Sequence, residues 1–150
     1  MRTATNYDVG PCVGNVLNVC FFPGLEEYKD GQYRFALEQM NRFLERPQYT
    51  SQNPKQAEYH SLGHYIRGMI YLYHAQGLGR HQLAIKDFLE SIRWSPKSYS
   101  SYFELSQAYA ELGLYTDAIE TIERLISVEP DPATRQDATK RLETLRSGPR

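Results

Sequence analysis

The chain repeats itself at an interval of 34 residues. A glycine, an alanine and a proline each recur after this interval, as Gly79 and Gly113, Ala84 and Ala118, and Pro96 and Pro130. Apolar positions recur in the same phase, as Ile85 and Ile119, Phe88 and Ile122, and Ile92 and Ile126. A period of this length is typical of a repeated helix-turn-helix unit that buries its apolar face against the next unit. Stacked units present a long concave surface rather than an enclosed catalytic pocket, so the period favours a binding module.

The clearest unit lies between residues 102 and 130. Its apolar residues predict a first helix with one buried face, and Gly113 ends that helix because glycine accepts a left-handed backbone without steric cost. A second helix is expected over residues 116–127. The residues of the motif are Tyr102, Leu105, Ser106, Tyr109, Gly113, Tyr115, Ala118, Ile122 and Pro130. This motif resembles the tetratricopeptide repeat, and the resemblance spans roughly residues 24–146. It implies an all-α fold, a right-handed α-solenoid of about three antiparallel helix-turn-helix repeats with a C-terminal capping helix.

The unit before this one carries four extra residues. Its first helix matches that of the later unit at an offset of 38 positions, whereas the second helices match at an offset of 34. We expect the insertion around residues 74–78, late in the first helix or in its turn, where four residues make about one helical turn. A weaker copy lies upstream, and there Pro23 either begins a short helix or kinks a longer one.

The repeats give the domain organisation. We expect one domain over residues 23–146, between an N-terminal apolar segment over residues 1–22 and a disordered tail over residues 147–150. The expected units of the domain are a degenerate repeat over 23–50, repeats over 61–98 and 99–132, and a capping helix over 132–146.

The composition excludes several classes of function. The formal net charge is -1, so the chain offers no basic field to a phosphate backbone, and nucleic-acid binding is not expected. No apolar run reaches membrane-spanning length and the N-terminus does not resemble a secretory leader, so we expect a cytoplasmic protein without membrane insertion. Cys12 and Cys20 are too few for a zinc site, and we expect them to be structural thiols. We expect no cofactor.

Candidate catalytic chemistry is sparse. His60 and His64 lie one helical turn apart, a spacing that can place two imidazoles on one metal ion. No third ligand is identifiable, and the sequence contains neither a phosphate loop nor a nucleophile motif. We therefore expect a protein that is not an enzyme. A metal-binding protein or small enzyme that uses His60 and His64 is the less favoured alternative.

The face of the first helices that the core does not use is expected to line the concave groove. The expected groove residues are Tyr65, Met69, Leu72, Tyr73, Gln76, Phe103, Gln107, Ala110 and Glu111. For Leu62 and Leu72, burial against neighbouring first helices is as well supported by the sequence as exposure in the groove. Family members that bind acidic chaperone tails use basic residues here, and none of the matching positions in this chain is basic. We therefore expect a scaffold or adaptor that binds an apolar or amphipathic peptide or helix of a protein partner.

The N-terminal segment has an apolar stripe of its own. Val13, Val16, Leu17, Cys20 and Phe21 share one face of a helix. Such a stripe would be an association site if it were exposed. It therefore packs on the first repeat as its missing helix, fills the groove, or forms the contact of a homodimer. The last placement gives an alternative function, a self-associating structural subunit.

Overall fold

The computed structural model describes residues 17–45 and 54–148, and all regular elements in these ranges are helices. A short π-helix, η2 (Leu17–Phe21), leads directly into the first α-helix. The α-helices are α1 (Phe22–Lys29), α2 (Tyr33–Leu44), α3 (Pro54–Tyr73), α4 (Arg80–Trp94), α5 (Tyr99–Glu111), α6 (Tyr115–Ser127) and α7 (Pro132–Arg146). The expectations for Cys12, Val13, Val16 and the last two residues of the tail lie outside the described ranges.

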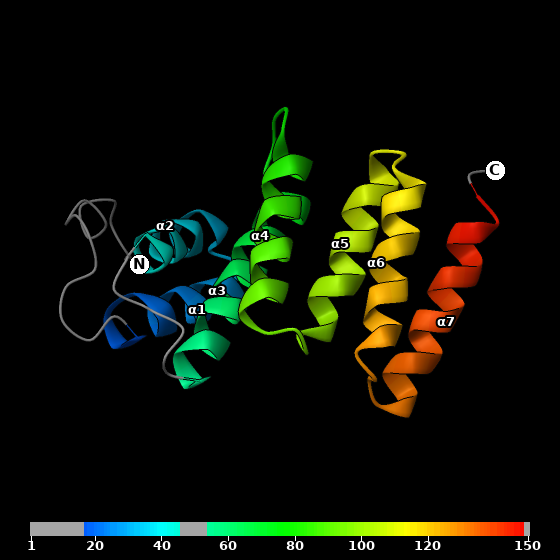
Figure 1. Cartoon of the computed structure of the whole chain (residues 1–150). Coiled ribbons are helices and arrows are strands. Elements are labelled where there is room, and N and C mark those ends of the chain that lie inside the picture. The colour runs from blue at the N-terminus through cyan, green and yellow to red at the C-terminus, as the bar shows by residue number, and fades with distance from the viewer. Residues whose placement is uncertain (1–16, 46–53, 149–150) are drawn as a thin grey trace.

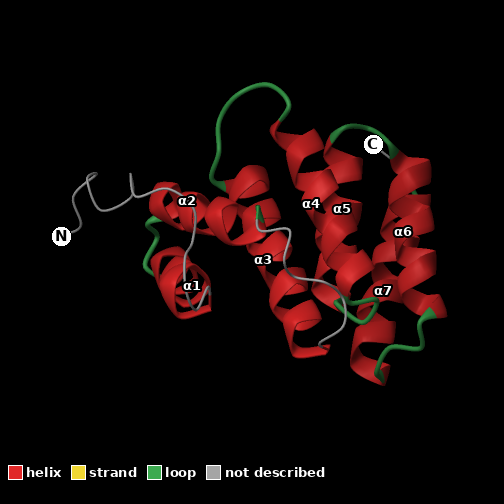
Figure 2. Cartoon of the chain, turned by 60° about the vertical axis from the view of Figure 1, so that its left-hand side comes forward, coloured by secondary structure: helices red, strands yellow, loops and turns green. Residues whose placement is uncertain are grey.

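Helices α1 to α6 form three antiparallel pairs, and α7 packs on the last pair. The helices follow one another in chain order across Figure 1, with α1 and α2 at one end and α7 at the other. In Figure 2, after the molecule is turned, α1 and α2 again lie at one end, and α3 to α6 follow in chain order. Helix α3 also contacts α5, and α5 also contacts α7, so these first helices share one face of the stack. The expected all-α solenoid of helix pairs with a capping helix is confirmed.

The two helices of a pair approach each other where a residue without a side chain faces a large one. A Cβ atom added at Gly24 in α1 would lie 2.9 Å from Cβ of Gln39 in α2, beside the end of the Met40 side chain. One added at Gly68 in α3 would lie 2.7 Å from the ring of Phe88 in α4. Both distances are shorter than a relaxed carbon–carbon contact. Glycine is therefore required at Gly24 because the Cβ of Gln39 cannot move aside, and at Gly68 while α4 keeps Phe88.

In the third pair, residues of different size occupy the same crossing. By the repeat register, Ser106 in α5 faces Ile122 in α6, and both are fully buried. Isoleucine is smaller than phenylalanine, so the first helix has room for a serine side chain. The recurring alanines Ala84 and Ala118 are also 0% exposed, as expected for small residues at helix crossings. The repeat register is therefore confirmed.

The four inserted residues lengthen a loop and not a helix. Helix α3 ends at Tyr73 and α5 ends at Glu111, which are equivalent positions at the offset of 38. The connection to α4 covers residues 74–79, whereas the connection from α5 to α6 covers only residues 112–114. The longer loop projects beyond the neighbouring turn in Figure 1. The insertion expected around residues 74–78 therefore lies in the turn and adds no turn to the helix, since Gly77 and Gly79 adopt positive φ angles that a helix does not contain.

The end of the N-terminal segment completes the first helix pair. Cys20 and Phe21 are 0% exposed, and the Phe21 ring lies 5.1 Å from the rings of both Phe43 and Tyr59. Together η2 and α1 form one helix that packs on α2, with the π-helical turn placed just before Pro23. Residues 17–21 therefore pack on the first repeat. Cys20 and Phe21 present no surface for the groove or for a homodimer.

Cys20 is disulfide-bonded, so the expectation of a structural thiol at this position is wrong. Disulfides persist mainly in oxidising compartments, and this bond does not favour the expected cytoplasmic location. No helix in the described ranges combines the length and apolar character needed to cross a membrane.

Gly68→Ser is expected to lower the free energy of unfolding by about 1 to 3 kcal/mol, because the added atoms enter the space of the Phe88 ring. Adding Phe88→Ile copies the serine and isoleucine of the third pair and should recover most of this loss. Urea unfolding followed by circular dichroism measures both variants. If the double variant recovered nothing, the crossing would not be governed by the size of these two side chains.

Candidate functional site: the concave groove

The groove face of α3 and α5 carries a strip of partly exposed side chains. Among the expected groove residues, the half-buried ones are Tyr65, Met69, Phe103, Gln107 and Ala110, and the exposed ones are Tyr73, Gln76 and Glu111. Along α3 the strip begins at Leu62, which is 38% exposed, and ends at Tyr73, which is 46% exposed. These side chains give the first helices an apolar and aromatic surface between their two ends.

Two of the expected groove residues do not lie on this strip. Leu72 is 1% exposed and belongs to the hydrophobic core that α3 shares with α4 and α5. Packing between helices, the alternative explanation for Leu72, is therefore the correct one. Gln76 lies beyond the end of α3, in the loop to α4, because the inserted residues lengthen that loop.

One end of the strip is hollowed into a pocket of about 150 Å³. Its walls are formed by Tyr73, Phe103, Glu104, Gln107 and Arg141. The Tyr73 hydroxyl donates a hydrogen bond to Oε2 of Glu104 at 2.5 Å, and the Arg141 guanidinium donates one to Oε1 of Gln107. The pocket therefore joins α3, α5 and α7 and contains one carboxylate and one guanidinium.

The carboxylate of Glu104 contributes to a raised pKa at three tyrosines. Burial raises the pKa of Tyr73, and the hydrogen bond to Glu104 raises it further. Burial also raises the pKa of Tyr65 and of Tyr28, and in both cases the charge of Glu104 adds to the effect. All three phenols are therefore neutral at physiological pH. Tyrosines from α1 and α3 thus gather near one negative charge on α5.

The other end of the strip is hollowed into a second pocket of about 220 Å³. It is lined by Glu58, Ser61, Leu62, Tyr65, Ser95, Ser98 and Ser100. Leu62 and Tyr65 supply its apolar wall, and the serine hydroxyls and Glu58 supply hydrogen-bonding groups. The strip is therefore apolar along its middle and polar in a pocket at each end.

Arg141 is not among the groove residues expected from the sequence, because the last helix is expected there only as a cap. Arg141 follows Gln107, its hydrogen-bond partner, by 34 positions. One further application of the repeat period therefore places Arg141 on the groove face. The period itself was the signal that could have found it.

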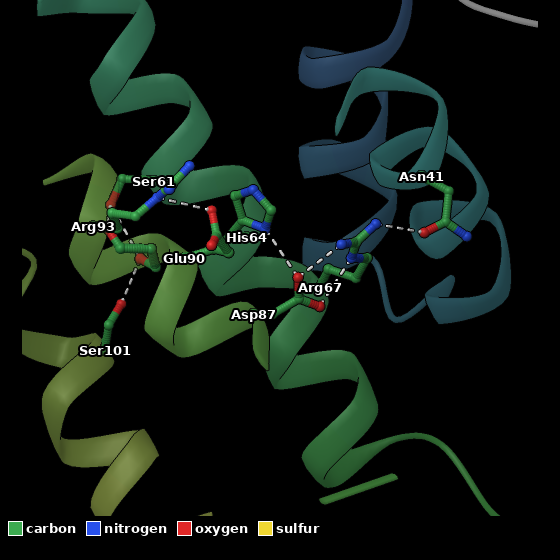
Figure 3. A network of polar contacts seen from close by, with 9 residues as sticks. Asn41, Ser61, His64, Arg67, Asp87, Glu90, Arg93 and Ser101 are labelled. Carbon is green, nitrogen blue, oxygen red and sulfur yellow. Dashed lines mark hydrogen bonds and ion pairs between the residues drawn. The ribbon is translucent and has the colours of Figure 1, made fainter. Parts of the chain in front are cut away.

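A buried polar network lies behind the groove, between α2, α3 and α4 (Figure 3). Arg67 donates two hydrogen bonds to Asp87, at 2.9 Å from Nε and 2.8 Å from a terminal nitrogen. Arg67 also donates to Asn41 at 3.0 Å, and Nδ1 of His64 lies 2.9 Å from Asp87. The side chain of Asp87 is only 3% exposed. This network holds the first two helix pairs together and does not open into either groove pocket.

The positions of the charged Arg67 and Asp87 are occupied by uncharged residues in the next repeat. In the repeat register Arg67 corresponds to Leu105, and Asp87 corresponds to Thr121. Burial alone would lower the pKa of the Arg67 guanidinium, but its hydrogen bond to Asp87 and the charge of Asp87 raise it above its ordinary value. The Arg67 guanidinium therefore remains charged inside the protein.

The two histidines of the metal-site alternative are engaged in different contacts. The ring of His60 stacks on Trp94, with 4.5 Å between centroids, and lies 5.1 Å from the ring of Phe43. His64 turns instead toward Asp87. Within the described residues, no group of three or more histidine, cysteine, aspartate or glutamate residues could hold a metal ion. These contacts give the metal-site alternative no support.

Comparison with known proteins agrees with this architecture. Residues 99–132 match the family model described as the tetratricopeptide repeat. The chain carries a tetratricopeptide repeat and has the fold of that family. No curated protein matches the sequence.

Three solved structures show the extent of the tetratricopeptide-repeat fold. The type III secretion chaperone SycD of Yersinia enterocolitica, in complex with a peptide of the translocator YopD, is 14% identical and has a TM-score of 0.68, with 89% of this chain and 95% of SycD covered. The first repeat domain of Spaghetti (RPAP3), bound to the HSP90 peptide SRMEEVD, is 19% identical and has a TM-score of 0.63, with 93% and 96% covered. MamA is 19% identical and has a TM-score of 0.59, with 89% and 77% covered. The likeness therefore covers almost the whole chain.

Arg67→Leu should lower the free energy of unfolding by about 3 to 5 kcal/mol, because it leaves the Asp87 carboxylate buried without its main partner. The double variant Arg67→Leu with Asp87→Thr copies the third repeat and should regain most of this stability. Thermal and urea unfolding of the two variants test this. Equal losses in both would show that the charged pair contributes more than neutral packing can replace.

The stability of the fold should fall as the pH drops from about 6.5 toward 4. Burial, with a smaller contribution from His64, lowers the pKa of His60 from 6.5 to about 4, so the unfolded chain binds a proton that the folded chain does not. By about pH 5 this difference costs about 2 kcal/mol. His60→Phe should remove this part of the pH dependence in urea unfolding at pH 7 and pH 5. An unchanged difference between the two pH values would assign the effect to other groups.

Proposed function

We propose that this protein is a protein-interaction module, a scaffold or adaptor that holds an apolar or amphipathic segment of a partner protein in its concave groove. The observation that carries the proposal is the strip along α3 and α5 from Leu62 to Tyr73, which stays partly exposed and is hollowed at both ends. Aromatic side chains held by a rigid helical stack lose little freedom on binding, so they form good contact surfaces.

The core explains why this strip is rigid. Tyr65 packs partly against both hydrophobic clusters of the chain, and Phe103 packs against the larger one. Each ring therefore has one side fixed by the core and another available to a ligand. Extended or helical peptides commonly bind such grooves by placing apolar anchors in pockets along one line.

Similar folds support the same role. SycD and RPAP3, which are similar in fold, each have a peptide bound, and this supports a peptide ligand here. The groove chemistry here differs from what an acidic tail requires, because the pocket residues include Glu58 and Glu104 and only one arginine, Arg141. We therefore propose a ligand whose main contribution is apolar surface.

A self-associating subunit remains the second candidate, on the observation that Val19 and Phe22 are 42% and 38% exposed. These side chains lie at the start of the first helix pair, and the Phe22 ring packs against that of Tyr59 in α3, with 5.8 Å between centroids. Neither residue lines the two groove pockets described. The two functions are therefore compatible and can be tested separately.

Tyr65→Ala together with Phe103→Ala should abolish capture of the partner while the helical circular dichroism stays unchanged, because both rings supply groove surface. The matched control is Lys86→Ala with Glu123→Ala, two exposed residues of the second helices α4 and α6. Pull-down from the source cell followed by mass spectrometry compares the two variants with wild type. Loss of the captured protein in the control but not in the groove variant would move the binding surface to the second helices.

A further inference from the structure

We infer that the partner segment places a lysine or arginine side chain beside Glu104, so that the groove recognises a basic residue within an otherwise apolar sequence. This inference rests on the proposed function of the groove. It concerns which charge the ligand carries and where that charge binds.

Glu104 combines a carboxylate with aromatic surroundings. Its Oε2 atom accepts the hydrogen bond from Tyr73, and the rings of Tyr73 and Phe103 line the same pocket. Tyr65 and Tyr28 lie close enough for the charge of Glu104 to raise their pKa. Aromatic faces attract ammonium and guanidinium groups, and a carboxylate among them strengthens that attraction.

The charge of Glu104 is not balanced by an ion pair within the described part of the chain, where no lysine, arginine or histidine nitrogen is recorded within 4.0 Å of it. Arg141 lines the same pocket but donates its recorded hydrogen bond to Gln107. Water balances the carboxylate while the groove is empty. A peptide that covers the pocket removes that water.

The cost of covering Glu104 decides the chemistry of the ligand. A wholly apolar peptide would bury the carboxylate with only the Tyr73 hydroxyl as a partner, and burial of an unpaired charge opposes binding. An acidic peptide would add a second negative charge beside it. A basic side chain replaces the lost water with a charge-assisted hydrogen bond. Its aliphatic stem can at the same time lie on the neighbouring rings.

The other charges along the strip also favour a basic ligand. Glu111 accepts a hydrogen bond from Gln107 at 3.2 Å and lies 3.4 Å from Nε2 of His81, and Glu58 lines the second pocket. Carboxylates therefore occur at both ends of the strip, whereas Arg141 is the one arginine or lysine in the two pockets described. The rival is a ligand acceptor group bound by Arg141, and the two possibilities predict opposite effects when Arg141 loses its charge.

The experiment begins with selection of displayed twelve-residue peptides on the folded protein, and on the Tyr65→Ala with Phe103→Ala variant as a counter-selection. We expect the enriched peptides to carry one lysine or arginine at a fixed position among apolar residues. Replacement of that lysine by norleucine, which keeps the stem and removes the charge, should weaken binding about tenfold in fluorescence anisotropy. With Glu104→Gln the same replacement should change the affinity less than about twofold.

The controls separate this inference from the proposed function. Arg141→Gln should increase the affinity for the basic peptide, because it removes a like charge from the pocket, whereas Glu120→Gln, at an exposed residue of α6, should have no effect. Thermal melts check that each variant is folded. Enriched peptides without a basic residue, or acidic peptides weakened by Arg141→Gln, would overturn the inference and leave the groove function intact. If no peptide is enriched over the counter-selection, the groove function fails and the inference fails with it.

Discussion

The close approach of two helices within each repeat is the constraint on which the rest of the structure depends. A Cβ atom at Gly24 would collide with Cβ of Gln39, and one at Gly68 would collide with the Phe88 ring. These close pairs bury Met40, Phe88 and Ile122 of the second helices completely. The first helices then keep a second, partly exposed face, which is the proposed groove.

Polar contacts fix how successive pairs are placed. Asp87 binds Arg67 and His64, and Arg67 reaches Asn41 in the first pair. Buried charge pairs of this kind add little stability compared with apolar packing, but they are costly when a partner is lost or misplaced. The network therefore favours one arrangement of the first two pairs. Helix α5, which belongs to the third pair, is held beside α3 by its own packing on α3 and α4, and this packing sets how Tyr65 and Phe103 lie relative to each other.

The strip along α3 and α5 is apolar in the middle and has charged groups in its two pockets, and in the proposed function these two properties contribute differently to binding. Apolar contact surface gives affinity with little selectivity, because many sequences can bury it. A single carboxylate that loses its water on binding rejects ligands that cannot supply a partner for it. Glu104, held by Tyr73 and surrounded by aromatic rings, is in the position to make that selection. Arg141 gives the same pocket a second polar group with the opposite charge.

The sequence alone determined the repeat, the helix pairs and the burial of Ala84 and Ala118, because these follow from local periodicity and residue size. It also located the four inserted residues, but only the structure placed them in the loop, since two left-handed glycines end the helix there. The pairing of Arg67 with Asp87 was not predictable, because the partners are 20 positions apart and meet only when α3 packs on α4. Leu72 and Tyr73 are adjacent in the sequence, and both are among the groove residues expected from it. Tertiary packing alone decided that Leu72 is buried and that Tyr73 faces the groove.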